Sequence, residues 1–396
     1  MMMQNSRKNS LQIFQVLQNL VTDDRVLLDQ LKFFFGETTR FLQYVIRHAD
    51  FAPPLSILKP LKGCDATTRD SLQTWFEQDY KGPVQILFGV AEEKDPVCEV
   101  VRALQRSHPE VDASLMVCPL DDSPNAKAAK LARMVEKASH NFVLVSDADV
   151  RVPGDFLTQF VQPLQHEKVG MVHCLYRLAN PANWAMRCEA LAVNVDFWSQ
   201  VLQARMLGQT KFALGAAMLV RRNVLDQIGG FAGLTRFLAD DYQLGNRIGS
   251  HGREVVLSNM VVECWDAPMT WRQVWHHQVR WARTIRISQP APYFFSLLSN
   301  ASLWPLLFLL QTILAGAPIS CLALGTILLA ARIAIALRLQ TLFIPEKNPL
   351  PDTAWVPVKD LLQPLVWLAA FCGNTVEWRG RKMRIQRDGT LESGGR

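Results

Sequence analysis

Short apolar runs alternate with helix-length stretches from Leu55 to Ser146, and this order constrains the fold more than any other feature of the chain. The pattern predicts strands at 56–58, 84–90, 113–118 and 142–146, with helices at 67–79, 96–106 and 124–138 between them. Such an order predicts a parallel sheet with helices on both faces. The chain contains no G-x-G-x-x-G and no Walker A loop, so neither a dinucleotide dehydrogenase nor a P-loop kinase is favoured.

Two carboxylates, Asp147 and Asp149, follow the strand predicted at 142–146. The carboxyl edge of an open α/β sheet is where ligands bind. Two hard oxygen ligands there suit Mg²⁺ or Mn²⁺, held together with the phosphates of a substrate. For an isolated Asp-x-Asp, a solvated turn is the simpler interpretation, so the hypothesis of a site depends on the residues that share this edge.

Other polar side chains are expected at the same edge. Asp95 follows the second strand, where it either contacts the base or ribose of a nucleotide or caps the helix that begins at Pro96. Asn125 and Lys127 open the next predicted helix and would supply a hydrogen-bond donor and a positive charge.

A second acidic pair, Asp240 and Asp241, stands ahead of a helical stretch. The pair either complements the positive end of that helix or supplies a general base that acts on an alcohol. The apolar run 212–220 precedes it, and Gly215 within this run indicates close approach of a ligand or of backbone. Further on, Arg280 and Trp281 either anchor an amphipathic helix at an interface or close over a pyrophosphate.

The last third of the chain is strongly apolar. Residues 294–314 and 317–337 are each long enough to cross a hydrocarbon core of ~30 Å, and 361–373 is shorter and predicted to be re-entrant or interfacial. Arg332 and Arg338 are placed to reach the cytoplasmic face. The alternative is a buried helical hairpin in a soluble protein.

The net charge and the cysteines indicate the partners and the compartment of the protein. The net charge is +6, and basic residues gather near the end of the chain, where they fit the anionic cytoplasmic leaflet; no nucleic-acid partner is predicted. The eight cysteines include no C-x-x-C pair, which favours reduced thiols in a cytosolic domain. Residues 1–50 have the spacing of amphipathic helices, without the apolar core of a cleavable signal peptide.

Several of these residues together resemble a known signature. Asp95, Asp147, Asp241 and the pair Arg280-Trp281 resemble the three aspartates and the (Q/R)-x-x-R-W motif of membrane-bound inverting glycosyltransferases. The segments SILKPLKG (56–63), EKVGMVH (167–173) and ADDY (239–242) resemble the ceramide glucosyltransferase family. The segments CLYR (174–177) and RWARTIR (280–286) are similar to bacterial relatives that glycosylate hopanoid lipids. These matches cover roughly residues 55–290 and are specific as a set.

The resemblance implies an α/β GT-A fold with a Rossmann-like mixed sheet, followed by transmembrane helices. The expected organisation is an amphipathic segment at 1–50, the GT-A domain at 51–290, a transmembrane hairpin at 291–340, and an interfacial segment with a basic cytoplasmic tail at 341–396. This organisation would be that of a multi-pass membrane protein whose catalytic domain faces the cytoplasm. The transmembrane helix that opens the family's chains is replaced by the amphipathic segment.

The implied activity is transfer of a sugar from a UDP-sugar to a lipid alcohol with Mg²⁺ or Mn²⁺. Transfer of glucose from UDP-glucose to ceramide is the leading hypothesis, and transfer of N-acetylglucosamine to a hopanoid polyol is the alternative. A processive polysaccharide synthase ranks lower, because the membrane region is short for a polymer channel. A nucleotide-binding membrane protein without activity is the remaining possibility.

The resemblance also implies roles for individual residues. Asp241 would be the catalytic base, Asp147 and Asp149 would hold the metal, and Asp95 would contact the uridine end of the donor. Arg280 and Trp281 would hold the diphosphate and the acceptor side. Lys59, Asn125 and Lys127 complete the donor-binding set. One departure is His277, which stands where the family motif has Gln or Arg and makes a contact there sensitive to pH.

Overall fold

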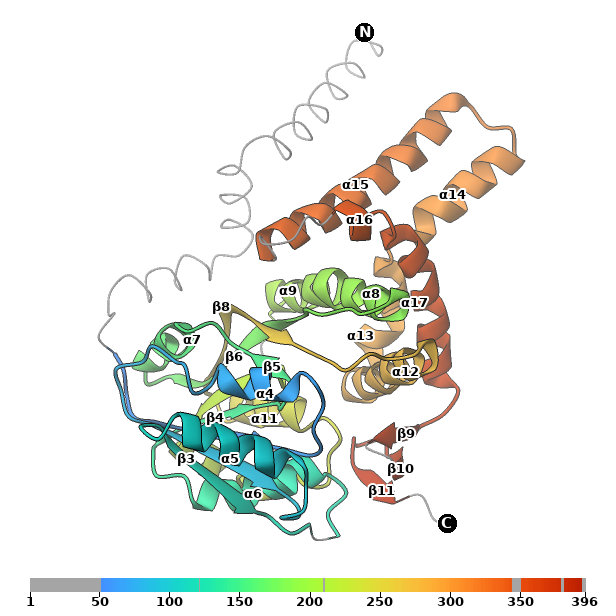
Figure 1. The fold of residues 1–396 in the computed structure, drawn as a ribbon. Helices are drawn as coiled ribbons and strands as arrows, with labels where there is room; N and C mark the ends of the chain where they lie inside the picture. Colours follow the sequence, from blue (N-terminus) through green and yellow to red (C-terminus); the bar gives the residue numbers. More distant parts are fainter. Residues whose placement is uncertain (1–50, 121, 209–210, 344–349, 379–380, 394–396) are drawn as a thin grey trace.

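The computed structural model describes residues 51–120, 122–208, 211–343, 350–378 and 381–393; the predictions for residues 1–50 lie outside this part of the chain. An eight-stranded sheet in the order β3-β2-β1-β4-β7-β6-β8-β5 forms its centre (Figure 1). The strands are β1 Leu55–Pro60, β2 Val84–Val90, β3 Asp112–Val117, β4 Phe142–Ser146, β5 Val150–Arg151, β6 Val169–Leu178, β7 Ala217–Arg221 and β8 Glu254–Cys264.

The first half of the sheet confirms the predicted alternation. Strands β1 to β4 are parallel, and the helices between them are α4 Thr68–Gln73, α5 Val97–Ser107 and α6 Ala126–Glu136. The helix predicted at 67–79 ends early. Asp79 donates its backbone N–H to the carbonyl of Gly154 at 2.7 Å and so leaves the helical hydrogen-bond pattern.

The second half of the sheet is not parallel throughout. Strand β7 runs antiparallel to both β4 and β6, and β5 runs antiparallel to β8. The expectation of a wholly parallel sheet is therefore wrong for this half. The sheet is mixed, in agreement with the arrangement that the resemblance implies.

Strand β4 shows why its sequence is continuously apolar. Leu144 packs into one buried cluster with Trp75 and Phe156, whereas Val143 and Val145 pack into a second cluster on the opposite face. Successive side chains of a strand point to opposite faces, so a strand covered on both faces has no polar position to offer. The polar residues begin only where the strand ends.

Shorter elements complete this domain. They are α7 Phe156–Phe160, η1 Gln162–Gln165, α8 Trp184–Leu191, η2 Ala192–Phe197, α9 Trp198–Met206, α10 Arg222–Gln227, η3 Ala232–Leu234 and α11 Asp240–Ser250. Segment η2 is one π-helical stretch inside a continuous helix formed with α8 and α9.

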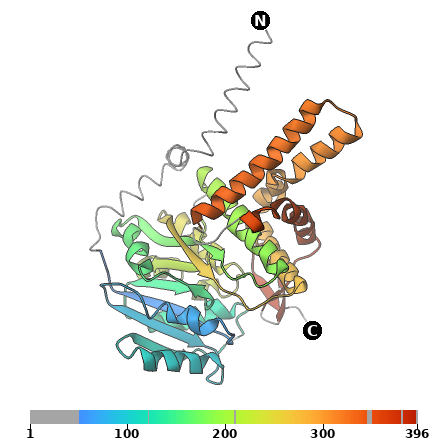
Figure 2. The ribbon, with the colours of Figure 1, turned by 45° about the horizontal axis from the view of Figure 1, so that its top comes forward.

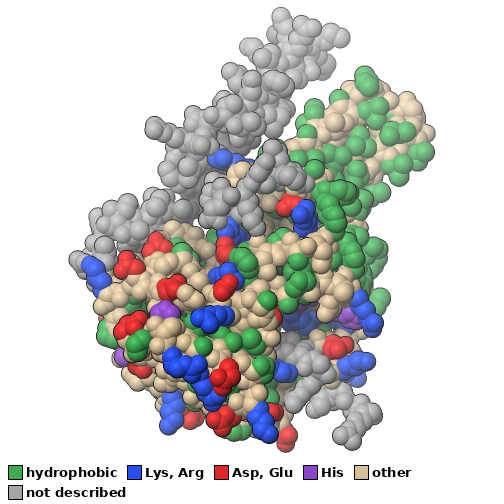
Figure 3. All heavy atoms as spheres, in the orientation of Figure 1, with side chains coloured by type: hydrophobic (Ala, Val, Ile, Leu, Met, Phe, Trp, Pro, Cys, Tyr) green, Lys and Arg blue, Asp and Glu red, His purple; other side chains and the backbone are tan. Residues whose placement is uncertain are grey.

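Helix α12, Trp271–Ser288, leads from the sheet domain to the apolar region, and Thr270 begins it with a capping box to Gln273. The helices that follow are α13 Pro290–Phe295, η4 Ser296–Ser299, α14 Leu303–Leu314, α15 Ile319–Phe343, α16 Leu350–Thr353 and α17 Val356–Phe371. Helices α14 and α15 form a hairpin that projects from the sheet domain in both views (Figures 1 and 2). Hydrophobic side chains dominate its surface (Figure 3).

Of the two membrane spans predicted for the hairpin, the second corresponds to one helix of sufficient length within the described residues. Ile319–Thr341 of α15 has 23 residues with a mean hydropathy of 2.1, enough by length and composition to cross a membrane. The first predicted span is instead divided. Pro290–Ser299 and Leu303–Leu314 meet at a bend of 44°, and would cross only as a broken pair.

Buried ion pairs connect the hairpin to the sheet domain. Arg332 of α15 donates to Asp360 of α17 at 2.9 Å and to Asp196 of η2 at 2.6 Å, and Lys359 contacts both carboxylates. We refer to these four residues as the junction cluster. Arg332 was expected to reach the cytoplasmic face; its side chain is instead enclosed here, because two carboxylates neutralise it.

The chain ends in a small folded unit. Strands β9 Thr375–Trp378, β10 Arg381–Ile385 and β11 Leu391–Ser393 form an antiparallel sheet in the order β11-β10-β9. Val376, Met383, Ile385 and Leu391 bury their side chains against Leu238 of the main domain. The residues predicted as a basic tail therefore include a packed sheet.

Candidate functional site

The carboxyl ends of β1 and β4 and the amino ends of α6 and α11 bring most of the predicted residues together. Lys127 is buried, and its Nζ lies 2.5 Å from Oδ1 of Asp147 and 3.9 Å from Oδ2 of Asp240. Burial opposes the charged form of this lysine, but Asp147 and Asp240 outweigh it and raise the pKa of Lys127. Lys127 is thus a fixed cation that joins the two acidic segments.

Asn125 positions both Lys127 and the second acidic segment. Its side-chain oxygen caps α6 by accepting the backbone N–H groups of Lys127 and Ala128, at 3.0 and 2.9 Å. Its amide nitrogen donates to the carbonyl of Phe237 at 2.8 Å and to Oδ1 of Asp240 at 3.3 Å. One residue therefore links the start of α6 to the start of α11.

Lys59 lies beneath this edge with no exposed surface. Its Nζ donates to Oγ of Ser146 at 3.3 Å and to the carbonyl of Asp147, and it sits 4.5 Å from the ring centre of Trp75. Burial lowers the pKa of Lys59 to about 7, although Asp149 and Asp147 oppose this shift. Lys59 therefore stabilises the Asp-x-Asp turn from the protein interior, because its side chain has no exposed surface.

Asp149 carries the opposite perturbation. Burial, followed by the negative charges of Asp147 and Asp266, raises its pKa to about 7. A bound cation would offset both effects, because it favours the carboxylate form. The paired oxygens of Asp147 and Asp149 fit Mg²⁺ or Mn²⁺. In the described residues no group of three or more His, Cys, Asp or Glu converges as a metal site, so donor phosphates and water would complete the coordination.

Asp241 faces the same edge from the first turn of α11. Its Oδ1 accepts the backbone N–H of Tyr242 at 2.7 Å. Burial and the neighbouring charge of Asp240 raise its pKa to about 6, although Lys127 opposes this shift. A carboxylate with a pKa near neutrality is suited to act as a general base.

Gly215 explains how Asp241 fits. A Cβ atom at residue 215 would lie 2.8 Å from Oδ2 of Asp241. A close approach does occur at this glycine, but the approaching group is the side chain of Asp241 and not the ligand or backbone that was expected. The glycine leaves space for this carboxylate.

Asp95 occupies a separate loop. Both of its oxygens accept the backbone N–H of Gly63 at 3.0 Å, and Oδ1 also accepts the N–H of Val97 at 3.1 Å. Asp95 therefore joins the loops that follow β1 and β2. It also accepts a backbone N–H at the start of α5, in agreement with the interpretation of Asp95 as a helix cap. These contacts keep its position at the sheet edge fixed.

Arg280 and Trp281 lie on α12, next to the edge. The end of this helix is tied to α11 because Gln289 donates to the hydroxyl of Tyr242 at 2.7 Å. Trp281 packs against His277, with ring centres 4.1 Å apart. The roles of Arg280 and Trp281 stay predictions.

Sequence reasoning missed the surroundings of His277. Its Nδ1 lies 2.8 Å from Oε1 of Glu189, a buried residue of α8 that also accepts a bond of 3.0 Å from Gln278. Asp266, whose pKa is raised by burial despite the charge of His277, was missed as well. The available signal for Glu189 was an acidic residue among the mostly apolar residues of α8, which also contains Arg187.

One protein family and several known proteins are similar to this chain. Residues 35–391 match the family described as glycosyl transferase family 21. Ceramide glucosyltransferase 1 of Caenorhabditis elegans is 24% identical over 207 residues, which are 52% of this chain and 44% of that protein. Beta-monoglucosyldiacylglycerol synthase of Trichormus variabilis is 29% identical over 164 residues, 39% of this chain and 33% of that protein. A mannosyltransferase of Pyrobaculum calidifontis in complex with GDP-Man and Mn²⁺ has a TM-score of 0.48 and 19% identity, covering 87% of this chain and 96% of its own.

The chain belongs to glycosyl transferase family 21, because the match extends over most of its length. The resemblance to ceramide glucosyltransferases is confirmed, and the mixed sheet agrees with the expected GT-A class. The chain spans about half the length of the curated relatives it matches.

Proposed function

We propose that this protein is a membrane-bound, inverting glycosyltransferase that moves a sugar from a UDP-sugar to a lipid alcohol. Glucose transfer from UDP-glucose to ceramide is the leading reaction. The observation that carries the proposal is the meeting of the two acidic segments at one sheet edge, where Lys127 lies 2.5 Å from Asp147 and 3.9 Å from Asp240. Membership of the family and the names of the matched relatives support the lipid acceptor.

The donor would bind along the carboxyl edge of β1, β2 and β4. Asp95 would meet the uridine end, and Asp147 and Asp149 would hold the divalent cation against the diphosphate. That cation would neutralise negative charge on the departing UDP. Lys127 and Arg280 would add positive charge on the protein side, since preorganised charges stabilise a transition state without reorganisation.

Asp241 would remove the proton of the acceptor hydroxyl as that oxygen attacks the anomeric carbon. The new C–O bond forms on the face opposite the bond to UDP, so an α-linked donor gives a β-glycoside. A positioned general base typically contributes ~10²–10⁴-fold to the rate. The pKa of about 6 lets Asp241 be ionised at neutral pH and still accept a proton.

The acceptor would arrive from the membrane. Helix α15 has the length and composition of a span, and the surface of α14 and α13 exposes Phe294, Phe295, Leu307 and Leu310. Trp281 would line the acceptor side, and the exposed basic residues Lys382, Arg384 and Arg387 favour a cytoplasmic orientation. Among the described residues, a second span beside α15 would need the bent pair Pro290–Ser299 and Leu303–Leu314 to cross as one.

The test uses membranes that contain the protein, supplied with Mg²⁺ or Mn²⁺. UDP-glucose and UDP-N-acetylglucosamine are offered separately against ceramide, diacylglycerol and a hopanoid polyol, and the lipid products are analysed by mass. We expect a lipid that has gained one hexose, with loss of product on addition of EDTA and in Asp241→Asn. Products with many sugars would indicate a processive synthase instead. No glycosylated lipid from any pairing, while an authentic ceramide glucosyltransferase works in parallel, would refute the lipid acceptor.

A further inference from the structure

The segment that carries Asp240 and Asp241 is bordered on one side by residues more than a hundred positions later in the chain. Leu391 of β11 donates its backbone N–H to the carbonyl of Arg236 at 2.7 Å, and Phe237 forms an antiparallel bridge with Thr390. Leu238, only 7% exposed, packs among apolar side chains of the C-terminal sheet. The small sheet is thus joined to residues 236–238 by backbone and by side chains.

The same segment is held on its other side by Asn125. Besides its amide bonds to Phe237 and Asp240, Asn125 donates its backbone N–H to the carbonyl of Thr235 at 2.9 Å. Residues 235–240 therefore lie between the cap of α6 and the C-terminal sheet. Displacement of the sheet would leave the contacts with Asn125, Lys127 and Arg247 to fix the approach to α11.

Helix α12 is tied to this unit as well. Arg283 donates to the carbonyl of Thr375, and Arg286 donates to the side chain of Asn374 and, at 3.4 Å, to the carbonyl of Gly373. Ile287 packs against the apolar cluster of the sheet. The sheet thus contacts both the acidic segment and the helix that carries Arg280 and Trp281.

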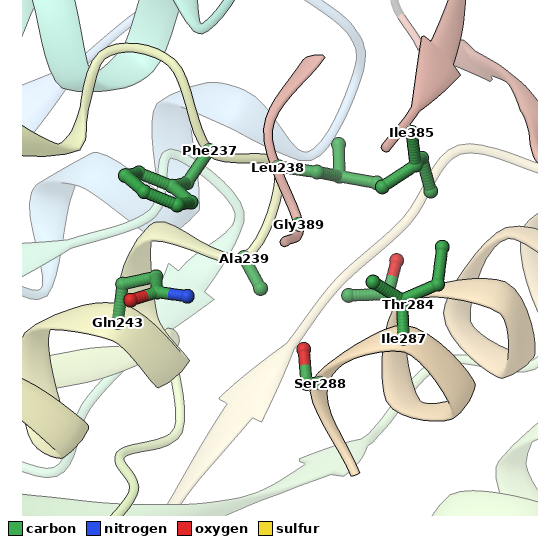
Figure 4. Close-up of a pocket in the computed structure, with 9 residues that line it drawn as sticks. All are labelled: Phe237, Leu238, Ala239, Gln243, Thr284, Ile287, Ser288, Ile385 and Gly389. Carbon is green, nitrogen blue, oxygen red and sulfur yellow. The ribbon is translucent and has the colours of Figure 1, made fainter. Parts of the chain in front are cut away.

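Figure 4 shows the place where the three parts meet. A small pocket there is lined by Phe237, Leu238 and Ala239 of the acidic segment, Gln243 of α11, Thr284, Ile287 and Ser288 of α12, and Ile385 and Gly389 of the C-terminal sheet. The acidic segment, α11 and α12 line this pocket, and the C-terminal sheet closes one side of it.

We infer that the C-terminal sheet β9–β11 is a positioning element, which sets the placement of Asp241 relative to Arg280 and Trp281 without touching substrate. Its buried face, with Met383, Ile385 and Leu391, contributes this placement. Its opposite face, with Lys382, Arg384 and Glu392, is exposed and has no part in it. The inference rests on the proposed function wherever turnover is the readout.

The discriminating variant is Leu391→Ala in the full chain, because it removes apolar contact with Leu238 and keeps the backbone bond to Arg236. Glu392→Ala, at the next residue and exposed, is the matched control, and Leu391→Ile is the conservative variant. We expect Leu391→Ala to lower kcat by about 10- to 100-fold, as a small misplacement of catalytic groups does, with KM for the UDP-sugar within twofold. Glu392→Ala and Leu391→Ile should retain wild-type kcat.

Amide hydrogen exchange supplies a readout that does not depend on turnover. We expect Leu391→Ala to increase exchange over residues 235–243 and to leave β4 and its Asp-x-Asp turn unchanged. Unaltered exchange in 235–243 would overturn the inference, as would equal loosening of β4. If the wild type transfers no sugar and the exchange pattern is still as expected, the proposed function fails while the positioning contact stands.

Discussion

Two groups of charges, one at the sheet edge and one at the junction with the hairpin, are built differently. The sheet edge holds two lysines, Lys59 and Lys127, with four aspartates, Asp147, Asp149, Asp240 and Asp241. The junction cluster holds Arg332 and Lys359 with Asp196 and Asp360. Acids outnumber bases at the edge, and the numbers are equal at the junction.

The difference appears in how the carboxyl groups titrate. At the junction, burial opposes the charge of Asp360, but Lys359 and Arg332 outweigh it and lower its pKa. At the edge, burial and neighbouring acids raise the pKa of Asp149 to about 7 and of Asp241 to about 6. In a cluster with equal numbers of acids and bases, the charges compensate one another without a ligand. In a cluster with more acids than bases, the excess negative charge is compensated only by bound protons or a cation. Under the proposed function, the contrast separates a structural connection from a site that binds a cation and a donor substrate.

The strongest test of this contrast is Asp241→Asn. The substitution keeps the shape of the side chain and removes the base, so we expect kcat to fall by ~10²–10⁴-fold. UDP binding, measured by calorimetry in the presence of Mn²⁺, should stay within about threefold of wild type. Wild-type turnover in this variant would remove Asp241 from its role and with it the functional meaning of the acid-rich edge.

Arg332→Met tests the junction. Removal of one partner leaves Asp196 and Asp360 short of positive charge, and we expect a loss of stability of about 3–5 kcal/mol. Thermal unfolding in detergent measures it, and the double variant Arg332→Met/Asp360→Asn should recover part of the loss because it restores the balance of charge. If the loss of stability in the double variant equals the sum of the losses in Arg332→Met and Asp360→Asn, the four residues do not act as a unit.

Gly215→Ala tests the fit of Asp241 by sterics alone. The added Cβ would lie 2.8 Å from Oδ2 of Asp241, so the carboxylate must shift, and we expect kcat to fall by about 10- to 100-fold with UDP affinity unchanged. Gly154→Ala is the control, since its Cβ would meet nothing nearer than 3.6 Å. A Gly215→Ala enzyme with normal kcat would show that the position of Asp241 tolerates displacement.

The smallest expected effect is on the dependence of stability on pH without donor or metal. Carboxyl groups with raised pKa values bind protons more tightly in the folded state, so their contribution is present at low pH and declines as pH rises through about 6 and 7. Asp360 has the opposite sign, and its contribution is lost only as pH falls below its ordinary value. Burial lowers the pKa of His173 to about 3 and that of Lys59 to about 7, and both groups oppose this trend. The contribution of Asp149 is therefore measured against the variant Asp149→Asn. We expect the Tm of the wild type relative to this variant to decrease between pH 5 and about 7, and Mn²⁺ with UDP to reverse the decrease; a relative Tm that rises over this interval would contradict it.

The sequence predicted the elements whose signals are local. Strand β4 and the turn at Asp147 were recognisable because an apolar run ends abruptly on acids, and Asn125 was recognisable by its place at a helix start. The antiparallel direction of β7 has no local signal, since the same apolar run suits either direction. The early end of α4 at Gln73 also has no clear local signal, and the chain beyond it forms turns through the bonds from Trp75 to Leu72 and from Phe76 to Gln73.

The missed parts of the molecule depend on contacts between residues far apart in the chain. Asp196 and Arg332 are 136 positions apart, and Arg283 and Thr375 are 92 apart. Nothing within either segment of such a pair identifies the distant partner. The C-terminal sheet was hidden for the same reason, because its basic residues dominate the composition and its few apolar ones face Leu238.

The π-helical stretch η2 sets the angular register of one long helix. Glu189 precedes it and faces His277 of α12, while Asp196 lies within it and faces Arg332 of α15. Each residue of an α-helix turns the chain by about 100°, so a one-residue deletion inside 192–197 would swing one of these carboxylates away from its partner. The helix thus acts as a fixed angular spacer between α12 and α15, and we expect a change of length in this stretch to break one of the two ion pairs.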